Sequence, residues 1–174
     1  MKLILAPNDF LDKKVKRFDY TQLDPFSTAF NMSDIMIKNG GLGLAANQVE
    51  LDAQIFVMKP VINKADISVL GVTTVINPRV AQISEEMFSE IEGCLSYPGI
   101  FLKISRPRKI AVEYDTLTQD GRSVIRVGQI YEDIDARIFL HEFDHLNSVQ
   151  FIDRVSMLKR QMSLKKLSKN KQRK

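Results

Sequence analysis

The stretch DIDARIFLHEFDHL, residues 133–146, organises the predicted fold. Its apolar residues recur at the three- and four-residue spacing of a helix with one buried face, namely Ile134, Ile138, Phe139, Phe143 and Leu146. Both histidines of the chain, His141 and His145, lie in this helix within an HExxH sequence. Side chains four residues apart project from the same helix face, so the two imidazoles can bind one metal ion. The alternative is a pair of histidines on a helix surface.

A catalytic metal site with one open position needs a third protein ligand elsewhere in the chain. The extended pattern HExxHxxGxxH is excluded, because Ser148 and Phe151 stand where its glycine and third histidine would be. A downstream glutamate is also missing, since Asp153 is the only acidic residue after the HExxH sequence. Cys94 is the best remaining candidate, in the loop EGCLSYPG of residues 92–99, whose glycines and proline allow unusual backbone geometry. The alternative for this residue is a buried core cysteine.

Hydrophobic patterns and turn residues predict the other elements. We expect a helix at residues 25–38, strands at 54–58 and 72–76, a hairpin joining 109–114 to 123–127 through Asp120-Gly121, and a helical continuation at 157–167. The second strand is expected to stop at Asn77-Pro78, because proline has no N–H to give to a neighbouring strand.

Composition predicts one compact domain. The chain has 174 residues, of which 44% are hydrophobic and 26% charged, as in ordinary globular proteins. The single cysteine cannot form an internal disulfide, which suits a reducing compartment. No segment approaches the ~20 apolar residues of a membrane span. We therefore expect an unprocessed cytoplasmic protein without a membrane segment.

The end of the chain is strongly basic, although the formal net charge is only +4. Residues 154–174 contain nine lysines and arginines and no acid. This pattern predicts a catalytic domain at residues 1–160 and a basic C-terminal extension at 161–174, with frayed last residues. A solvated helix end is the plain alternative.

Three motifs together resemble the signature sequences of peptide deformylases. They are GLGLAANQ at residues 41–48, EGCLS at 92–96 and HEFDHL at 141–146. The flanking Ile76-Asn77-Pro78 and Arg106-Pro107 agree, and the resemblance covers roughly residues 1–160. With the elements above, it implies an α+β fold of antiparallel or mixed β-sheets packed around a central HExxH helix, with a C-terminal helix.

The resemblance also implies an activity, the removal of the N-formyl group from N-formylmethionine of nascent polypeptides with release of formate. The expected metal ligands are Cys94, His141 and His145, and the ion is Fe²⁺, with Zn²⁺, Ni²⁺ and Co²⁺ as alternatives. Glu142 would transfer protons, while Gln48 and the Leu95 N–H would stabilise the oxyanion. For the substrate groove we expect Leu42, Gly43 and Ile138, the last of which is equally explained as core packing.

Two positions depart from the usual motif. Leu140 stands where glutamine is common, and Ser148 where glycine is common. The loss of the glutamine is expected to change metal affinity or rate rather than reaction type.

The expected partners are a formylated nascent peptide and, through the basic tail, the ribosome, with the enzyme itself a monomer. Two rival functions remain at this point. One is an HExxH endopeptidase that cleaves internal peptide bonds, and the other is a non-catalytic RNA-binding protein with a structural metal.

Overall fold

The computed structural model describes residues 1–62 and 71–171. Within these residues, a five-stranded antiparallel sheet has the strand order β1-β2-β3-β6-β7, and β4 and β5 form a separate antiparallel pair. The strands are β1 Gly43–Ala45, β2 Ile55–Met58, β3 Thr73–Ile83, β4 Met87–Gly93, β5 Phe101–Pro107, β6 Lys109–Leu117 and β7 Val124–Glu132.

Three α-helices accompany the sheets in the described part of the chain. They are α1 Pro25–Lys38, α2 Asp133–Leu146 and α3 Met157–Lys171, and short 3-10 helices lie at η1 Asp9–Asp12, η2 Ala46–Val49 and η4 Phe151–Arg154. This arrangement confirms the predicted α+β class with antiparallel sheets. No helix among residues 1–62 and 71–171 has the length and apolar character needed to cross a lipid bilayer.

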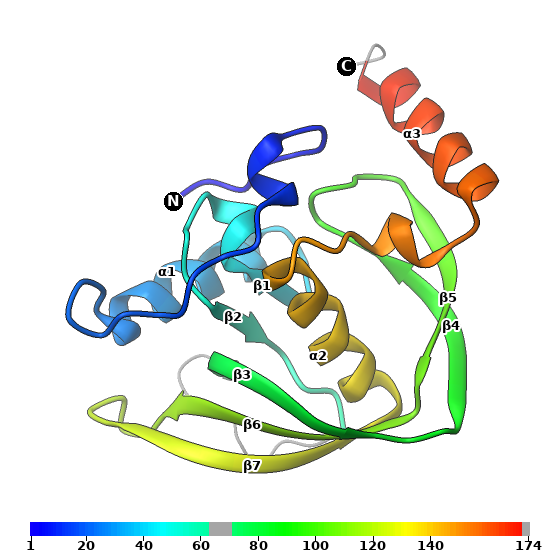
Figure 1. Cartoon of the computed structure of the whole chain (residues 1–174). Coiled ribbons are helices and arrows are strands. Elements are labelled where there is room, and N and C mark those ends of the chain that lie inside the picture. Colours follow the sequence, from blue (N-terminus) through cyan, green and yellow to red (C-terminus); the bar gives the residue numbers. More distant parts are fainter. Residues whose placement is uncertain (63–70, 172–174) are drawn as a thin grey trace.

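The HExxH sequence lies on α2, which contacts β1, β2 and β7 of the large sheet and also β5 of the small one. Figure 1 shows α2 between the large sheet and the β4–β5 pair, with α1 beside β1 and β2. The fold therefore holds the two histidines where both sheets meet.

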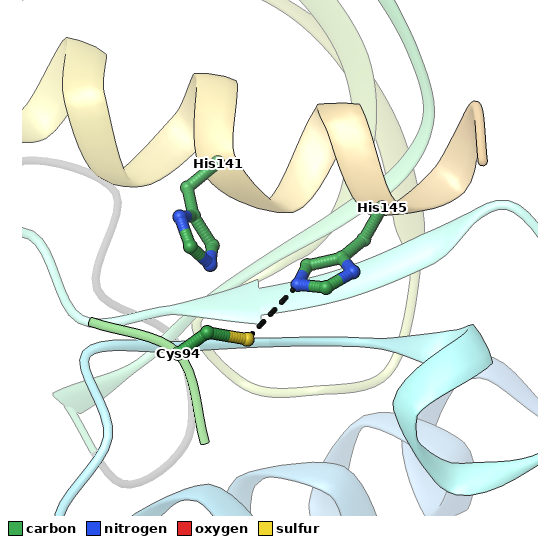
Figure 2. Close-up of side chains that lie close together, drawn as sticks. All are labelled: Cys94, His141 and His145. Carbon is green, nitrogen blue, oxygen red and sulfur yellow. Dashed lines mark hydrogen bonds between the residues drawn. The ribbon is translucent and has the colours of Figure 1, made fainter. Parts of the chain in front are cut away.

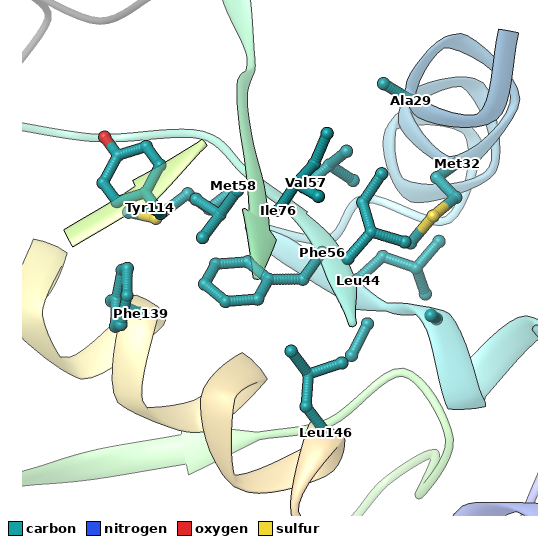
Figure 3. Packing of buried hydrophobic residues seen from close by; sticks show 14 of the residues in the cluster. Ala29, Met32, Leu44, Phe56, Val57, Met58, Ile76, Tyr114, Phe139 and Leu146 are labelled. Carbon is teal, nitrogen blue, oxygen red and sulfur yellow. The ribbon is translucent and has the colours of Figure 1, made fainter. Parts of the chain in front are cut away.

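The main core lies between α2 and the large sheet. Phe56 of β2 and Phe139 of α2 meet edge to face, with ring centroids 5.1 Å apart, and both are fully buried. Figure 3 shows these rings on one side of the strand, while Ala29 and Met32 of α1 lie on its other side. A second cluster, centred on Tyr97, Phe151 and Ile152, also buries Leu167 of α3.

Local sequence explains the ends of α1. The Asp24 carboxylate accepts a hydrogen bond from the Ser27 N–H at 2.7 Å, and Pro25 occupies the first helical position, where no N–H partner is needed. Gly40 follows the helix with a φ of 68°, the left-handed conformation that glycine adopts at helix ends. The predicted helices at residues 25–38 and 133–146 are confirmed.

The predicted end of the strand at Asn77-Pro78 is wrong. Strand β3 continues to Ile83, and its register against β6 shifts between Ile76 and Arg79. Asn77 has a φ of 48°, and its side-chain oxygen accepts the Phe18 N–H at 2.8 Å. A β-bulge thus absorbs the proline, so that pairing resumes beyond it.

The predicted hairpin is confirmed by β6 and β7, whereas β4 and β5 were not predicted. The helix predicted at residues 157–167 is confirmed and extends to Lys171. Residue 160, the predicted domain boundary, falls inside this helix. Residues 172–174 of the predicted extension, including its predicted frayed end, lie outside the described residues.

Candidate metal centre and active site

Cys94 and the two histidines of α2, which are distant from it in sequence, converge on one point. Cys94 directly follows β4, while His141 and His145 lie one turn apart on α2. The Cys94 Sγ lies 3.2 Å from the His145 Nε2, and one ligand atom from each of the three residues lies within 4.8 Å of the others. Figure 2 shows the sulfur directed at the two rings that descend from α2. The predicted trio is therefore brought together, and Cys94 is partly exposed rather than a buried core cysteine.

This donor set fits a divalent transition metal. A tetrahedral ion about 2.3 Å from a thiolate sulfur and about 2.0 Å from each imidazole nitrogen requires ligand atoms roughly 3–4 Å apart. The Cys94 Sγ and the His145 Nε2, at 3.2 Å, meet this requirement, and the limit of 4.8 Å for the whole trio lies somewhat above it. A thiolate with two imidazoles accepts Fe²⁺, Zn²⁺, Ni²⁺ or Co²⁺. His141 and His145 are also buried, so the protein shields this side of the site from solvent.

The Glu92 carboxylate orients His141. Its Oε2 lies 3.0 Å from the His141 Nδ1, so the other ring nitrogen faces Cys94. A carboxylate on the far nitrogen sets the tautomer of a ligating histidine and increases its basicity. Arg106 donates to both oxygens of Glu92, at 2.6 and 2.9 Å, and Arg137 donates to Oε1.

The charges around the two histidines favour a cation at this point. Burial acts to lower the pKa of His141, but Cys94 and Glu92 outweigh it and raise that pKa to about 10. The negative potential that holds a proton on this ring also attracts a metal ion. Burial and the neighbouring His141 lower the pKa of His145, which keeps its ring in the neutral form that binds metals.

Gln48 lies at the same point, at the end of η2. Its amide nitrogen is 3.4 Å from the Cys94 Sγ and donates to the Ser96 hydroxyl at 3.1 Å. Its amide oxygen accepts the Ala45 N–H at 2.9 Å. The side chain is 1% exposed, so these bonds hold a preorganised donor beside the metal position.

Glu142 is buried next to the ligands, and its Oε2 has no hydrogen-bond partner among the described residues. Burial raises its pKa to about 7, which suits a group that takes and returns a proton. Gly43 makes room for this carboxylate, because a Cβ at residue 43 would lie 2.3 Å from the Glu142 Oε1.

A pocket of about 420 Å³ opens beside these groups. All three residues predicted to contact substrate, Leu42, Gly43 and Ile138, line it, as does Leu95. No described residue accepts a hydrogen bond from the Leu95 N–H. Because Ile138 is only 6% exposed, it serves both the core and the pocket wall.

The two departures from the usual motif have local consequences. Leu140 is partly buried and packs against the main core, where it offers no hydrogen bond to the ligands. Ser148 has a φ of 61°, the left-handed conformation at the end of α2 that costs a residue with a side chain about 1–2 kcal/mol. A glycine would adopt this conformation at less cost, which explains its frequency there.

Sequence reasoning missed how the site is supported. Glu92 stands two residues before Cys94, and residues two apart in an extended chain point to the same side. This spacing could have indicated that Glu92 lies near the metal ligands. Arg137 stands four residues before His141 on the same helix face and carried a similar signal. Arg106 stands in the flanking Arg106-Pro107 of the family resemblance, but no spacing in the sequence indicates its contact with Glu92, which depends on how β5 pairs with β4.

Comparison with known proteins agrees with this geometry. A family model described as polypeptide deformylase matches residues 1–161. A peptide deformylase of Thermotoga petrophila is 39% identical over 155 residues, which cover 89% of this chain and 85% of that protein. A crystal structure of peptide deformylase from Ehrlichia chaffeensis has a TM-score of 0.81 at 32% identity and covers 99% of this chain and 97% of its own.

A plant relative is longer. Peptide deformylase 1B, chloroplastic/mitochondrial, of Arabidopsis thaliana is 31% identical over 156 residues, and the match covers 90% of this chain but 54% of that protein. The chain thus spans about half the length of this curated relative. These likenesses show that the chain belongs to the polypeptide deformylase family, whose known activity is the removal of the formyl group from nascent peptides.

We predict that Glu92→Gln lowers the affinity for Co²⁺ by about 10–100-fold, because the His141 ring loses its charged partner. Affinity would be measured by competition with a chelator, and circular dichroism would confirm that the variant is folded. A folded variant with unchanged Co²⁺ affinity would show that Glu92 does not orient the ligand.

Proposed function

We propose that this chain is a metal-dependent amide hydrolase that removes the formyl group from N-formylmethionine of nascent polypeptides. The observation that carries the proposal is the cluster of the Cys94 thiol and two imidazoles within 4.8 Å, at the wall of an apolar pocket. Water and the formyl amide are the reactants, and formate and a free N-terminal amine are the products.

The proposed ligands are the Cys94 sulfur and one nitrogen each of His141 and His145. A bound divalent ion, for which we propose Fe²⁺, would supply a Lewis acid that lowers the pKa of a water and polarises the formyl carbonyl. Metal analysis after anaerobic purification tests the identity of the ion, and a predominance of another metal would contradict the choice of iron.

Glu142 is the proposed proton carrier. Its buried carboxylate takes a proton from the attacking water and returns it to the nitrogen of the departing amine. The room that Gly43 leaves for this side chain supports the assignment, because the carboxylate is held against the strand that borders the pocket. The pocket also accepts an unbranched methionine side chain beside Leu42 and Ile138.

Gln48 and Leu95 are the proposed oxyanion donors. Attack on the formyl carbon converts the carbonyl oxygen into an anion, which needs preorganised N–H groups within hydrogen-bonding distance. The amide nitrogen of Gln48 already lies beside the Cys94 sulfur, and Leu95 lines the pocket.

We expect Glu142→Ala to retain metal and lose formate release, because the ligands stay while the proton carrier is removed. Formate would be measured with formyl-Met-Ala-Ser, and the unformylated peptide would serve as control. Equal formate release by both proteins contradicts the mechanism. Cleavage of the unformylated peptide by the wild type would favour the endopeptidase alternative instead.

Gln48→Leu is predicted to reduce kcat by ~100-fold or more, the scale for one lost oxyanion donor. Leucine keeps the bulk of the side chain but removes the amide, so KM is expected to change little. Steady-state kinetics with the same formylated peptide would measure both constants. A variant that loses affinity for substrate while keeping its kcat would assign Gln48 to binding alone.

We also propose ribosome contact through α3, with the enzyme acting as a cytoplasmic monomer. Ser163 and Leu167 of this helix are buried, whereas Lys165 and Lys169 are exposed, so its basic side remains free to meet phosphate groups. The reduced thiol that the mechanism needs suits a reducing compartment. Gel filtration would test the monomeric state.

The basic face of α3 is expected to give salt-dependent ribosome binding. Replacing Lys165 and Lys169 by glutamine should flatten the slope of log affinity against log salt by about 1–2, because two phosphate contacts are lost. Co-sedimentation with ribosomes measures this, with glutamine at the exposed Lys14 and Lys103 as the matched control. Identical slopes for the two variants would reject the contact, and formate release by both would reject a purely RNA-binding role.

A further inference from the structure

Arg154 lies outside the pocket, yet it contacts the HExxH helix. It ends η4, the short helix between α2 and α3, and its side chain is 45% exposed. Its Nε donates to the Asp144 Oδ2 at 2.9 Å, and its Nη2 donates to Oδ1. Asp144 itself is only 8% exposed and lies on α2 directly before the proposed ligand His145.

A continuous line of hydrogen bonds leads from this contact to the metal position. The Asp144 Oδ2 also accepts from the Arg106 Nη1 at 2.8 Å. Arg106 uses its two remaining nitrogens on Glu92, at 2.6 and 2.9 Å. Glu92 in turn holds the His141 Nδ1 at 3.0 Å. The side chains of Arg106 and Glu92 are 4% and 3% exposed, so water screens these interactions little.

We propose that Arg154 is a positioning residue for the metal centre and acts on His141 through Asp144, Arg106 and Glu92. The inference rests on the proposed metal-dependent function. With Arg154 in place, two guanidinium groups share the Asp144 carboxylate. Without it, Arg106 alone must neutralise this carboxylate and is drawn toward it, which loosens its paired contact with Glu92.

A purely structural role makes a different prediction. Arg154 would then only fasten η4 to α2, and its loss would lower the stability of the C-terminal segment without changing the metal. Arg160 provides the matched control, because its Nε donates to the Asp153 Oδ1 at 2.7 Å and its side chain is 47% exposed. Each arginine thus pairs with an aspartate, Arg154 through two nitrogens with the buried Asp144 and Arg160 through one with the 36% exposed Asp153, but only the pair of Arg154 leads to Glu92.

The test compares Arg154→Met with Arg160→Met in the full chain, loaded with Co²⁺. We expect Arg154→Met to lower the affinity for Co²⁺ by about 3–10-fold and to shift the visible absorption of the bound ion. This loss of affinity is smaller than that expected for a residue that touches a metal ligand directly. Arg160→Met should stay within about twofold of the wild type. Arg154→Lys keeps the charge but not the two-pronged contact and should recover part of the loss.

Several outcomes would overturn the inference. Equal Co²⁺ affinity and spectra for Arg154→Met and Arg160→Met would leave Arg154 with a structural role only. If Arg154→Met does not fold, Arg154→Lys carries the comparison, and a spectrum identical to that of the wild type then counts against the proposal. Failure of the wild type to bind Co²⁺ would instead overturn the metal-dependent function, and this inference with it.

Discussion

Four hydrogen bonds converge on the buried carboxylate of Glu92, and the site depends on them. A buried carboxylate is stable only when positive or hydrogen-bonding partners replace the water it has lost. Its partners come from β5, through Arg106, and from α2, through Arg137 and His141. The β4–β5 pair and α2 must therefore meet in one arrangement before this charge is satisfied. Because Cys94 follows Glu92 by two residues, the same arrangement carries the thiol to the two imidazoles.

Some buried polar atoms at the site lack the hydrogen-bond partners that Glu92 and Arg106 have. Glu92 and Arg106 are fully engaged, whereas the Glu142 Oε2 and the His145 Nδ1 have no hydrogen-bond partner among the described residues. Unpartnered buried groups cost free energy, and their presence is typical of positions where substrate, metal or water must bind. The four hydrogen bonds to Glu92 beside them help to explain how the fold tolerates this cost. Gly43 also helps to accommodate the buried Glu142, because the absence of a side chain at residue 43 leaves the space that the carboxylate fills.

Much of this arrangement could be predicted from the sequence. The parts that could not be predicted depend on how the strands pair and on apolar residues that remain exposed. The helix at residues 133–146 was predictable because its apolar period and its HExxH sequence agree with one another. The convergence of Cys94 on the histidines followed from the chemistry of three-ligand sites. The strands β4 and β5 escaped prediction because their exposed faces include apolar residues such as Ile91 and Phe101, so burial does not alternate with sequence in the usual way. The role of Arg106 depends on strand pairing, which no local pattern encodes.

The buried residues of α3 and its exposed charges lie on different sides of the helix. The contribution of this helix to the fold can therefore be separated from its proposed role in docking. Leu167 is 3% exposed and joins Tyr97, which stands three residues after Cys94, in one hydrophobic cluster. The buried side of α3 therefore supports the loop that carries the thiol, while Lys165 and Lys169 lie exposed on the other side. Loss of the whole helix would disturb the metal loop and the basic face together. Exchange of exposed charges alone leaves the cluster intact, and for that reason only substitutions can distinguish a docking role of this helix from its contribution to the fold.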